Sequence, residues 1–258
     1  MRKKIIDFSK YSSIKIGDRI EVFVIEKIED LSDEFYIIGG ANNLLISPSP
    51  PPLAILSKKF DYIKIEDNKL FVGGATPGGK VLSFAKRYNI KNFEFLNSLP
   101  GTIGGMVKMN AGVKEYEIFN FLYAVKTKRG YIKKEDISYG YRYTDIEDVV
   151  FEAVFEIEKG FSKELLFKLK SFRKNQPKEP SAGSCFKNPS QDYAGRLIEA
   201  VGLKGYRIND AAFSEIHANF LVNLGKASFN DALNLIKLAE KRVYERFNIK
   251  LEREVIVL

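Results

Sequence analysis

Two segments of the chain carry side chains that could do chemistry on an anionic substrate. In "SYGYRYTD", Arg142 stands between Tyr141 and Tyr143. Its guanidinium group suits a carboxylate or a phosphate better than a lysine would. In "PSAGSCFKNP", Ser184 lies in a turn of small residues between two prolines. No histidine is close enough in the sequence to make this serine a nucleophile, but a serine can still donate a proton to a developing carbanion within hydrogen-bond reach.

Each of these residues also has a plainer interpretation. An arginine among tyrosines is often a surface residue that lies over aromatic rings, and a serine between prolines is often only a turn former. A third candidate, the pair Glu252 and Glu254 near the C-terminus, reads in isolation as one solvated face of a strand. The residues alone leave these alternatives open.

The segment "YIIGGANNLLIS" loses its large side chains where a strand is expected to end. Successive small residues, Gly39 to Ala41, can present backbone N–H groups in a concave nest that binds an anion such as phosphate. Asn42 and Asn43 tolerate left-handed backbone angles and can add amide donors. The alternative is a tight turn between two strands.

Two further segments are rich in glycine. "VGGATPGGK" spans residues 72–80, and "NSLPGTIGGMVKMNAGV" spans residues 97–113. Neither is a phosphate-binding P-loop, because Lys and Ser/Thr do not follow the glycines in the required order, and no G-x-G-x-x-G opens a helix after a strand. Several glycine-rich turns suit a long phosphate-bearing ligand such as the dinucleotide FAD. The alternative is a set of unrelated turns.

Composition narrows the choice of partners. The 258 residues carry a formal net charge of +8, which favours anionic partners, but the basic residues form no dense run. A single cysteine and a single histidine, Cys185 and His217, exclude an internal disulfide and a Cys/His metal site, so we expect no metal. No apolar run reaches the ~18 residues of a membrane helix, and the first residues do not form a signal peptide. We expect an intracellular protein.

The periodicity predicts strands early in the chain and helices later, hence an α+β fold. Strands are expected in 19–28 and 34–40, with a hairpin over 62–74 that turns at Asp67 and Asn68. A helix is expected over 79–90, and a partly exposed strand over 149–160. Later helices are expected to begin at caps and to end before breakers, and the chain is expected to close on a strand. Ser162 is expected to cap a helix that ends by Pro177 and has an apolar stripe of Leu165, Leu166, Leu169 and Phe172. Asp192 is expected to cap a second helix that stops at Gly202, and Ser228 and Asp231 are expected to form the capping box of a third. We also expect a terminal strand over 251–258 and a stiff proline-rich connector over 47–56.

Taken in order, these segments resemble the UDP-N-acetylenolpyruvoylglucosamine reductase (MurB) family. The resemblance runs through "IIGGANNLLIS", "SLPGTIGGMVKMNAG", "YGYRYTD" and "QPKEPSAGSCFKNP", and continues in "AGRLIEAVGLKG", "SEIHANFLVN" and "LEREV". It covers nearly the whole chain. The short interval between Arg142 and Ser184 resembles the family's shorter subclass, which lacks an extra tyrosine-bearing loop.

The resemblance implies three domains and a set of binding residues. Residues 1–55 would form a first FAD-binding subdomain, completed by a strand over 252–258, residues 56–158 a second, and residues 159–251 a substrate-binding domain. FAD would contact small residues from three segments, and the substrate would contact polar residues that follow the serine. The implied FAD contacts are Gly39, Gly40, Ala41, Asn42, Asn43, Leu44, Pro100, Gly101, Thr102, Gly104, Gly105, Asn110, Ala111 and Gly112, and the implied substrate contacts are Lys187, Asn188 and Tyr193.

The resemblance also implies the reaction. NADPH would reduce the bound FAD and leave, and UDP-N-acetylglucosamine enolpyruvate would take its place. The flavin would deliver a hydride to the enolpyruvyl methylene carbon, Arg142 and Glu254 would stabilise the enol-like intermediate, and Ser184 would protonate it to give UDP-N-acetylmuramate for peptidoglycan. A carboxyl group beside such an intermediate helps only if it is protonated or orients a donor, so we expect a raised pKa for Glu254. The expected enzyme is a cytoplasmic monomer that binds neither nucleic acid nor membrane.

Several positions depart from the family pattern. Asp18 stands where a glycine is usual, Asn42 where a serine is usual, and Ile216 where a lysine is common. Residues 206–217, which include Asn209 and Asp210, stand where the family has a glycine-rich segment. The residues that contact the outer part of the UDP group are therefore not assigned. His217 reads as scaffolding. Two other function classes are a related FAD-dependent oxidase of another small substrate and a basic nucleic-acid-binding module, which the scattered charges do not favour.

Overall fold

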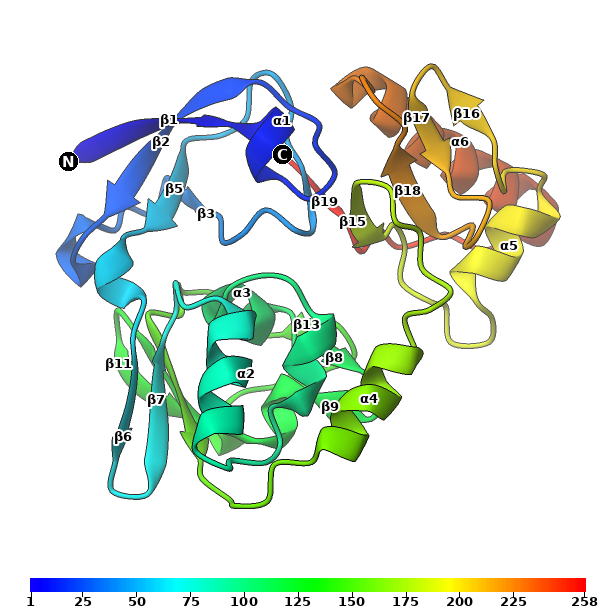
Figure 1. Cartoon of the computed structure of the whole chain (residues 1–258). Coiled ribbons are helices and arrows are strands. Elements are labelled where there is room, and N and C mark those ends of the chain that lie inside the picture. The colour runs from blue at the N-terminus through cyan, green and yellow to red at the C-terminus, as the bar shows by residue number, and fades with distance from the viewer. The chain divides into compact units, whose positions relative to one another are not determined.

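The computed structural model describes residues 1–258, with the side chain of Ser98 left out. The chain forms two compact units, and each is described here by itself (Figure 1). Unit 1 comprises residues 1–4, 22–40 and 52–174, and unit 2 comprises residues 5–21, 41–51 and 175–258. The division falls within two strands, β1 (Arg2–Asp7) and β2 (Arg19–Ile25). These strands belong to a four-stranded sheet of order β1-β2-β5-β3.

Unit 1 is built on a five-stranded sheet of order β11-β10-β14-β7-β6. Neighbouring strands of this sheet pair antiparallel. Helices α2 and α3 cover one face of this sheet, because Val81 and Ala85 of α2 and Met106 of α3 share one core with Val72 and Phe155 (Figure 1). The strands of unit 1 are β3 (Tyr36–Ile37), β5 (Leu53–Leu56), β6 (Ile63–Glu66), β7 (Lys69–Gly73), β8 (Gly112–Val113), β9 (Tyr116–Glu117), β10 (Leu122–Thr127), β11 (Gly130–Lys133), β12 (Tyr139–Gly140), β13 (Tyr143–Thr144) and β14 (Glu152–Glu156). Its helices are α2 (Gly78–Arg87), α3 (Ile103–Lys108) and α4 (Lys163–Ser171), with 3-10 turns η1 (Ile28–Asp30), η2 (Lys58–Phe60), η3 (Glu94–Ser98), η4 (Ile118–Asn120) and η5 (Lys134–Asp136).

The hairpin β6-β7 confirms the turn predicted at Asp67 and Asn68. Both residues have positive φ, 46° and 56°, as a two-residue type I′ turn requires. The turn sets the register in which Glu66 pairs with Lys69 and Ile63 pairs with Val72. The local sequence therefore fixed this part of the sheet.

Strand β14 corrects one expectation. The acidic residues at alternate positions predicted a partly exposed strand, but β14 lies in the middle of the sheet and Val154 is buried. Glu152 is only 3% exposed. Its carboxylate accepts hydrogen bonds from the hydroxyls of Tyr62 (2.5 Å) and Tyr131 (2.6 Å). Two phenol donors that are distant in sequence thus satisfy a buried charge, which the strand pattern alone does not reveal.

Unit 2 packs helices on a four-stranded sheet of order β15-β18-β17-β16. Ala232, Leu235, Ile236, Ala239 and Val243 of α6 form one buried stripe at helical spacing, and they share a core with residues of that sheet and of α5. The elements of unit 2 are α1 (Phe8–Tyr11), β4 (Leu44–Leu45), β15 (Ser181–Ser184), α5 (Ala194–Ala200), β16 (Arg207–Ile208), β17 (Ala211–Phe213), β18 (Phe220–Asn223), α6 (Phe229–Phe247) and β19 (Ile256–Val257).

Two of the three predicted N-caps of the later helices are confirmed, and one is wrong. Ser162 caps α4, since its hydroxyl accepts the amide of Leu165, and Ser228 and Asp231 form the predicted capping box of α6. The prediction of Asp192 as the cap of α5 was wrong: Tyr193 holds the N-cap position. Asp192 instead forms an ion pair with Arg196, and this hydrogen-bonded partner lowers the pKa of Asp192 to about 2.

Three other boundaries differ from the expectation. Helix α4 ends at Ser171, and of the predicted stripe only Leu169 is fully buried while Phe172 is exposed. The expected terminal strand shrinks to β19, which pairs parallel with β4. Residues 53–56 of the expected connector form β5, which is buried between β2 and β3 because both pair with it. Short apolar runs become strands by pairing with segments that are distant in the sequence. The local sequence therefore could not predict where these strands begin and end.

The three predicted domain ranges stay a prediction. The expected boundary near Gly160 precedes α4, whereas α4 lies in unit 1, since Leu169 is buried in its core and Glu94 accepts the amide of Ser162 at 2.7 Å. The mixture of helices and strands confirms the α+β class.

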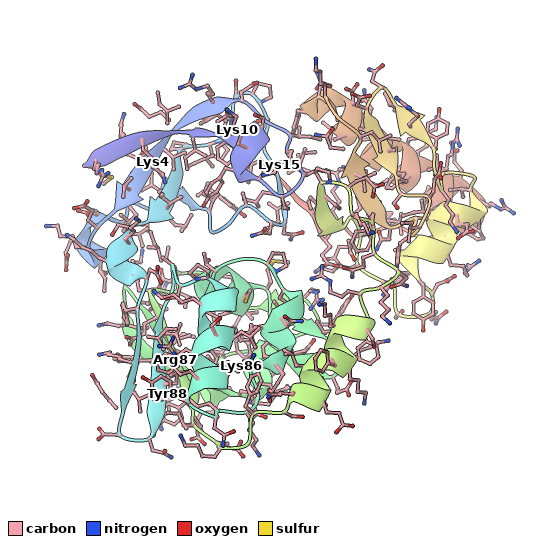
Figure 2. The ribbon with its side chains drawn as sticks, in the orientation of Figure 1. Lys4, Lys10, Lys15, Lys86, Arg87 and Tyr88 are labelled. Atoms are coloured by element: carbon pink, nitrogen blue, oxygen red, sulfur yellow. The ribbon has the colours of Figure 1, made fainter. Side chains whose placement is uncertain are left out.

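The charges are spread over many elements in both units. Lys86 and Arg87 stand in the last turn of α2, where cations interact favourably with the helix dipole (Figure 2). In the part of the chain that the structure describes, no helix combines the length and apolar character needed to span a bilayer. Among the same residues, His, Cys, Asp and Glu form no group that could hold a metal ion.

Candidate active site

In unit 1, the three predicted glycine-rich segments meet. The amide of Gly78 donates to the carbonyl of Gly101 (3.0 Å), and the amide of Gly104 donates to the carbonyl of Gly74 (2.9 Å). These bonds join residues 72–80 to the turn that opens α3. Gly39, at the end of β3, completes the group because a Cβ built there would lie 2.7 Å from the Thr102 hydroxyl oxygen. Three turns that are separate in sequence thus form one backbone surface.

At two of these positions, packing within the protein already requires glycine, without any ligand. A Cβ at Gly104 would lie 2.9 Å from the carbonyl oxygen of Val150, and a Cβ at Gly78 would lie 2.7 Å from the Met106 side chain. Gly105 is different, because its Cβ would meet only the Thr102 hydroxyl at 3.6 Å and the residue is exposed. Gly105 is therefore the position of α3 where a ligand can come close to the backbone.

The backbone amides around these turns fit an anion. Among the residues described, no acceptor receives the N–H groups of Gly101, Thr102 and Gly105, nor those of Gly40, Ala41 and Asn42. Ala41 is 2% exposed and has φ 48°, a left-handed angle that is unusual for alanine. Consecutive amides around a left-handed residue form a nest for an anion, so the backbone fits the phosphates of a dinucleotide.

Arg142 is held by the segment that follows α3. It lies in the two-residue turn between β12 and β13, with φ 54°, and its Nη2 donates to the carbonyl of Gly112 at 3.1 Å. The hairpin is tied down on both sides of Arg142, since Asn110 Nδ2 donates to the carbonyl of Gly140 (2.9 Å) and the Thr144 hydroxyl donates to the carbonyl of Lys108 (2.9 Å). Gly112 itself has no room for a side chain, because a Cβ would lie 2.5 Å from the carbonyl of Tyr116.

The side chain of Asn110 is fully engaged within unit 1. Asn110 is buried, its Nδ2 also donates to Glu117 Oε2 (2.8 Å), and its Oδ1 accepts the amide of Phe119 (3.3 Å). Contact between Asn110 and a cofactor would therefore involve its backbone. A second support, which the sequence did not suggest, is Lys108, whose ammonium group donates to the carbonyls of Ile146, Glu147 and Asp148.

In unit 2, Ser184 ends strand β15 and pairs with Phe220 of β18. The strand is irregular there, and Gly183 has φ 86°, so the backbone turns sharply just before the serine. Ser184 is partly exposed, and its hydroxyl has no hydrogen-bond partner among the described residues. Its side chain is free to face a substrate.

Glu254 lies beside Ser184 in unit 2. The amides of Glu254 (2.9 Å) and Val255 (3.2 Å) both donate to the carbonyl of Cys185. Asn43, one of the predicted FAD contacts, donates from its Nδ2 to the carbonyl of Glu254 at 2.8 Å. The structure thus brings together three residues that sequence analysis selected separately.

The alternative acid, Glu252, has a different role. Its carboxylate accepts a hydrogen bond from Lys187 Nζ at 2.6 Å, and its side chain is 70% exposed. Lys187, a predicted substrate contact, also donates its backbone amide to the carbonyl of Glu252 (2.8 Å). This pair ties the strand after Ser184 to the C-terminal segment. The geometry therefore favours Glu254 over Glu252 as the acid beside Ser184.

Cys185 adds no nucleophile to the site. The thiol is 1% exposed, and burial raises its pKa well above the ordinary range. A thiol that stays protonated and inaccessible is inert. The Ser184 hydroxyl therefore remains the candidate group of this segment.

The other two predicted substrate contacts flank helix α5. Asn188 Oδ1 accepts the amide of Ala194 at 3.0 Å, so this side chain satisfies one free N–H at the start of α5. Tyr193, the N-cap residue, is 71% exposed and its phenol is not buried against unit 2. Asn188 is thus held in place, whereas Tyr193 is open to a ligand.

One residue at this site escaped sequence analysis. Asn219 is 3% exposed, and its side chain contacts both backbone polar groups of Phe186. Its own amide donates to His217 Nδ1 at 3.3 Å, and burial lowers the pKa of His217. The interpretation of His217 as scaffolding agrees with this contact. Asn219 lies in "SEIHANFLVN", one of the segments that carry the family resemblance, but no local pattern indicates that its side chain bonds to Phe186.

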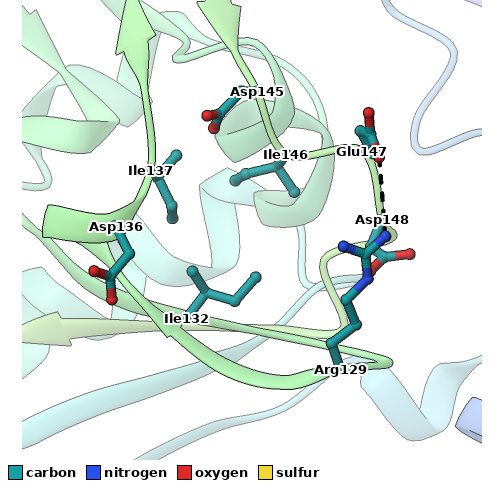
Figure 3. Close-up of a pocket in the computed structure, with 8 residues that line it drawn as sticks. All are labelled: Arg129, Ile132, Asp136, Ile137, Asp145, Ile146, Glu147 and Asp148. Carbon is teal, nitrogen blue, oxygen red and sulfur yellow. Dashed lines mark ion pairs between the residues drawn. The ribbon is translucent and has the colours of Figure 1, made fainter.

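A cavity of about 140 Å³ lies elsewhere in unit 1 (Figure 3). Its apolar floor is formed by Ile132, Ile137 and Ile146, and Arg129 and Asp148 form an ion pair of 3.0 Å at its rim. None of the predicted site residues lines it. The structure therefore describes two sets of candidate residues, the glycine-rich surface with Arg142 within unit 1 and Ser184 with Glu254 within unit 2.

Comparison with known proteins gives a consistent result. A family model described as the C-terminal domain of UDP-N-acetylenolpyruvoylglucosamine reductase matches residues 176–258. The reductase of this name from Helicobacter hepaticus is 52% identical over 262 residues, covering 100% of both chains. The one from Campylobacter jejuni strain RM1221 is 49% identical, covering 98% of this chain and 100% of that one. The crystal structure of the Thermus caldophilus reductase (MurB) superposes with a TM-score of 0.84 at 32% identity, covering 100% of this chain and 99% of that chain.

Proposed function

The chain belongs to the UDP-N-acetylenolpyruvoylglucosamine reductase family, and we infer that it reduces UDP-N-acetylglucosamine enolpyruvate to UDP-N-acetylmuramate in peptidoglycan synthesis. It is an oxidoreductase of cell-wall synthesis. The proposals below assign this activity to residues, with FAD as the bound cofactor and NADPH as the cosubstrate.

The backbone surface of unit 1 supports FAD binding. Amides of Gly101, Thr102 and Gly105 lack acceptors among the described residues and would hold the phosphates, together with the nest around Ala41. When bound, FAD accepts reducing equivalents from NADPH and supplies them to the enolpyruvyl double bond. The remaining proposed contacts follow the same segments, namely Gly39, Gly40, Asn42, Asn43, Leu44, Pro100, Gly104, Asn110, Ala111 and Gly112.

Arg142 and Glu254 have complementary proposed roles. Reduction of the methylene carbon places negative charge on the carbon beside the substrate carboxylate and on that carboxylate. The guanidinium of Arg142, anchored to the carbonyl of Gly112, would bind this anion, and one preorganised donor of this kind is worth roughly 3–4 kcal/mol. Glu254 would act in its protonated form as a hydrogen-bond donor to the same enolate, because an ionised carboxylate would repel it.

Ser184 would complete the reaction by protonating the carbanion carbon. Its hydroxyl has no partner among the described residues, so no internal hydrogen bond must break first. Solvent would then return the proton to the serine oxygen. Lys187, Asn188 and Tyr193 would contact the UDP-sugar around this strand.

One observation supports the assignment of Glu254 as the acid that acts with Ser184. The amide of Glu254 donates a hydrogen bond to the carbonyl of Cys185, the residue next to Ser184. Two candidates that are 70 residues apart in the sequence thus become neighbours. Since NADPH and UDP-sugars are cytoplasmic compounds, we place the reaction in the cytoplasm, and we propose a monomer.

The test separates the two half-reactions by stopped-flow absorbance of the flavin. The FAD-loaded wild type should be reduced by NADPH and then reoxidised without oxygen by UDP-N-acetylglucosamine enolpyruvate. Ser184→Ala should be reduced at a rate within about twofold of wild type, while its reoxidation should slow by 10² or more, roughly the contribution of a positioned general acid. A wild-type protein that binds no FAD, or whose reduced flavin ignores this substrate, would contradict the proposed function.

A further inference from the structure

We propose that Asn219 is a positioning residue that fixes the Ser184 hydroxyl for proton donation. The inference rests on the proposed function, because it takes Ser184 as the proton donor. Asn219 touches neither substrate nor cofactor in this proposal. It acts only through the backbone that carries the serine.

Three hydrogen bonds connect Asn219 to the two residues that follow Ser184. The carbonyl of Asn219 accepts the amide of Cys185 at 2.7 Å. Its side-chain Oδ1 accepts the amide of Phe186 at 3.0 Å, and its Nδ2 donates to the carbonyl of Phe186 at 2.7 Å. The side-chain amide thus satisfies both polar groups of one peptide residue, which a residue with only a donor or only an acceptor cannot do.

The backbone needs such support because of what precedes the serine. The pairing of β15 with β18 is irregular between Ser181 and Ser184, and Gly183 has φ 86°. Glycine can adopt many backbone conformations, so the strand pairing before Ser184 restrains the backbone at the serine only weakly. Asn219 supplies the restraint on the other side, in an environment where it is only 3% exposed and the bonds do not compete with water.

The same clamp reaches Glu254. The Phe186 amide that the Asn219 side chain accepts belongs to the same peptide group as the carbonyl of Cys185, which accepts the amide of Glu254 at 2.9 Å. Loss of the two side-chain bonds would therefore shift the backbone that carries the serine relative to this fixed contact. A shift of about 1 Å in a reacting group can cost ~10²-fold in rate.

The first experiment is Asn219→Ala in the FAD-loaded enzyme, with both half-reactions measured by stopped flow. Reduction by NADPH should stay within about twofold of wild type, while reoxidation by UDP-N-acetylglucosamine enolpyruvate should slow by about 10- to 100-fold. A second measurement needs no turnover: the amide of Phe186, whose acceptor is the Asn219 side chain, should lose hydrogen-exchange protection in the variant, whereas the amide of Cys185 keeps its backbone acceptor.

A double-mutant comparison separates positioning from general damage. If Asn219 acts through Ser184, then Asn219→Ala in a Ser184→Ala background should slow reoxidation by less than about threefold, because the group it positions is already gone. An equal slowing in both backgrounds would overturn the proposal. A reoxidation rate of Asn219→Ala within about threefold of wild type would overturn it too.

Asn223 provides a matched control. It is the last residue of strand β18, which begins directly after Asn219, and it is also 3% exposed. Its side chain bonds to the backbone of Ile14, Lys15, Gly225 and Ala227, and to no residue of 181–188. Asn223→Ala should lower the melting temperature as much as Asn219→Ala but leave reoxidation by the folded enzyme within about threefold of wild type.

A further variant covers the case in which Asn219→Ala does not fold. Asn219→Asp keeps the volume and the acceptor for the Phe186 amide but loses the donor to the Phe186 carbonyl. It should show the same selective slowing of reoxidation, and wild-type kinetics in this variant would contradict the proposal. If wild-type enzyme itself fails to reoxidise with the substrate, the proposed function fails, which is a different result from an unselective Asn219 variant.

Discussion

The backbone amide of Glu254 donates a hydrogen bond of 2.9 Å to the carbonyl oxygen of Cys185. The residue before Cys185 is the proposed proton donor, Ser184. A terminal segment that sequence patterns assign to a solvated strand face is thereby attached to the loop that carries the reacting hydroxyl. The carboxyl of Glu254 therefore starts from a fixed backbone, and this has consequences that can be measured.

The first prediction compares the two acids of this segment. Glu254→Gln should lower kcat by about 10²- to 10³-fold, since an amide is a poorer donor than a carboxylic acid and cannot exchange a proton with the substrate. Glu252→Gln should leave kcat within about threefold, because its exposed carboxylate contributes only a surface ion pair with Lys187. Steady-state kinetics of both variants decide the matter, and a larger loss for Glu252→Gln would reverse the assignment.

The second prediction concerns Arg142. Arg142→Lys should lower kcat/KM by about 10²- to 10³-fold, because one ammonium group cannot both bond the Gly112 carbonyl and present a planar fork to a carboxylate. Reduction of the flavin by NADPH should be unchanged. Arg129→Lys, at an exposed arginine that pairs with Asp148 of the same unit, is the control and should keep wild-type kinetics. A wild-type kcat/KM in Arg142→Lys would remove the arginine from the site.

The third prediction uses the adjacent glycines of α3. Gly104→Ala should lower the free energy of unfolding by about 1–3 kcal/mol, because the new methyl would lie 2.9 Å from the Val150 carbonyl oxygen and 3.0 Å from that of Gly74. Gly105→Ala meets only ordinary contacts and should not destabilise the protein. It should instead weaken FAD binding, if the cofactor approaches the backbone there as proposed.

Denaturant unfolding of the FAD-free protein and a fluorescence titration with FAD measure the two effects separately. Equal stability of both variants would show that the packing at Gly104 yields more easily than its neighbours suggest. Wild-type FAD affinity in Gly105→Ala would move the cofactor away from this turn.

The fourth prediction concerns pH and His217. Burial lowers the pKa of this imidazole below its ordinary value, so between pH ~6.5 and the folded-state pKa the unfolded chain binds a proton that the folded chain does not. The free energy of unfolding should therefore fall as the pH drops below about 6.5. Protonation of the folded enzyme removes the acceptor for the Asn219 amide, so any slowing of flavin reoxidation from this cause should begin only below the folded-state pKa, at a lower pH than the fall in stability.

Unfolding curves at pH 7.5 and 5.5 measure this effect, with His217→Asn as the comparison. The variant retains a polar side chain but no longer titrates, so the difference in its unfolding free energy between the two pH values should be smaller. His217 is the only histidine of the chain, which makes the comparison clean. An unchanged pH dependence in the variant would mean that carboxylates, and not His217, govern stability in this range.

Local sequence determined those features whose physics is local. The Asp67-Asn68 turn and the caps at Ser162 and Ser228 depend on residues within one or two turns of chain, and the structure has them as predicted. The family was also readable from the sequence, because ordered motifs survive where chemistry fixes the residue type. The site residues taken from that resemblance remain predictions.

Tertiary structure alone decided which segments meet. Glu152 is buried because two tyrosines from other strands donate to it, and Asn219 clamps the chain after Ser184 across a gap of more than thirty residues. Short strands such as β5 and β19 exist only because a distant strand pairs with them. A hydrogen bond between residues far apart in the chain leaves no period in the sequence around either one, and for that reason the sequence suggested candidate reacting groups but not the residues that hold them.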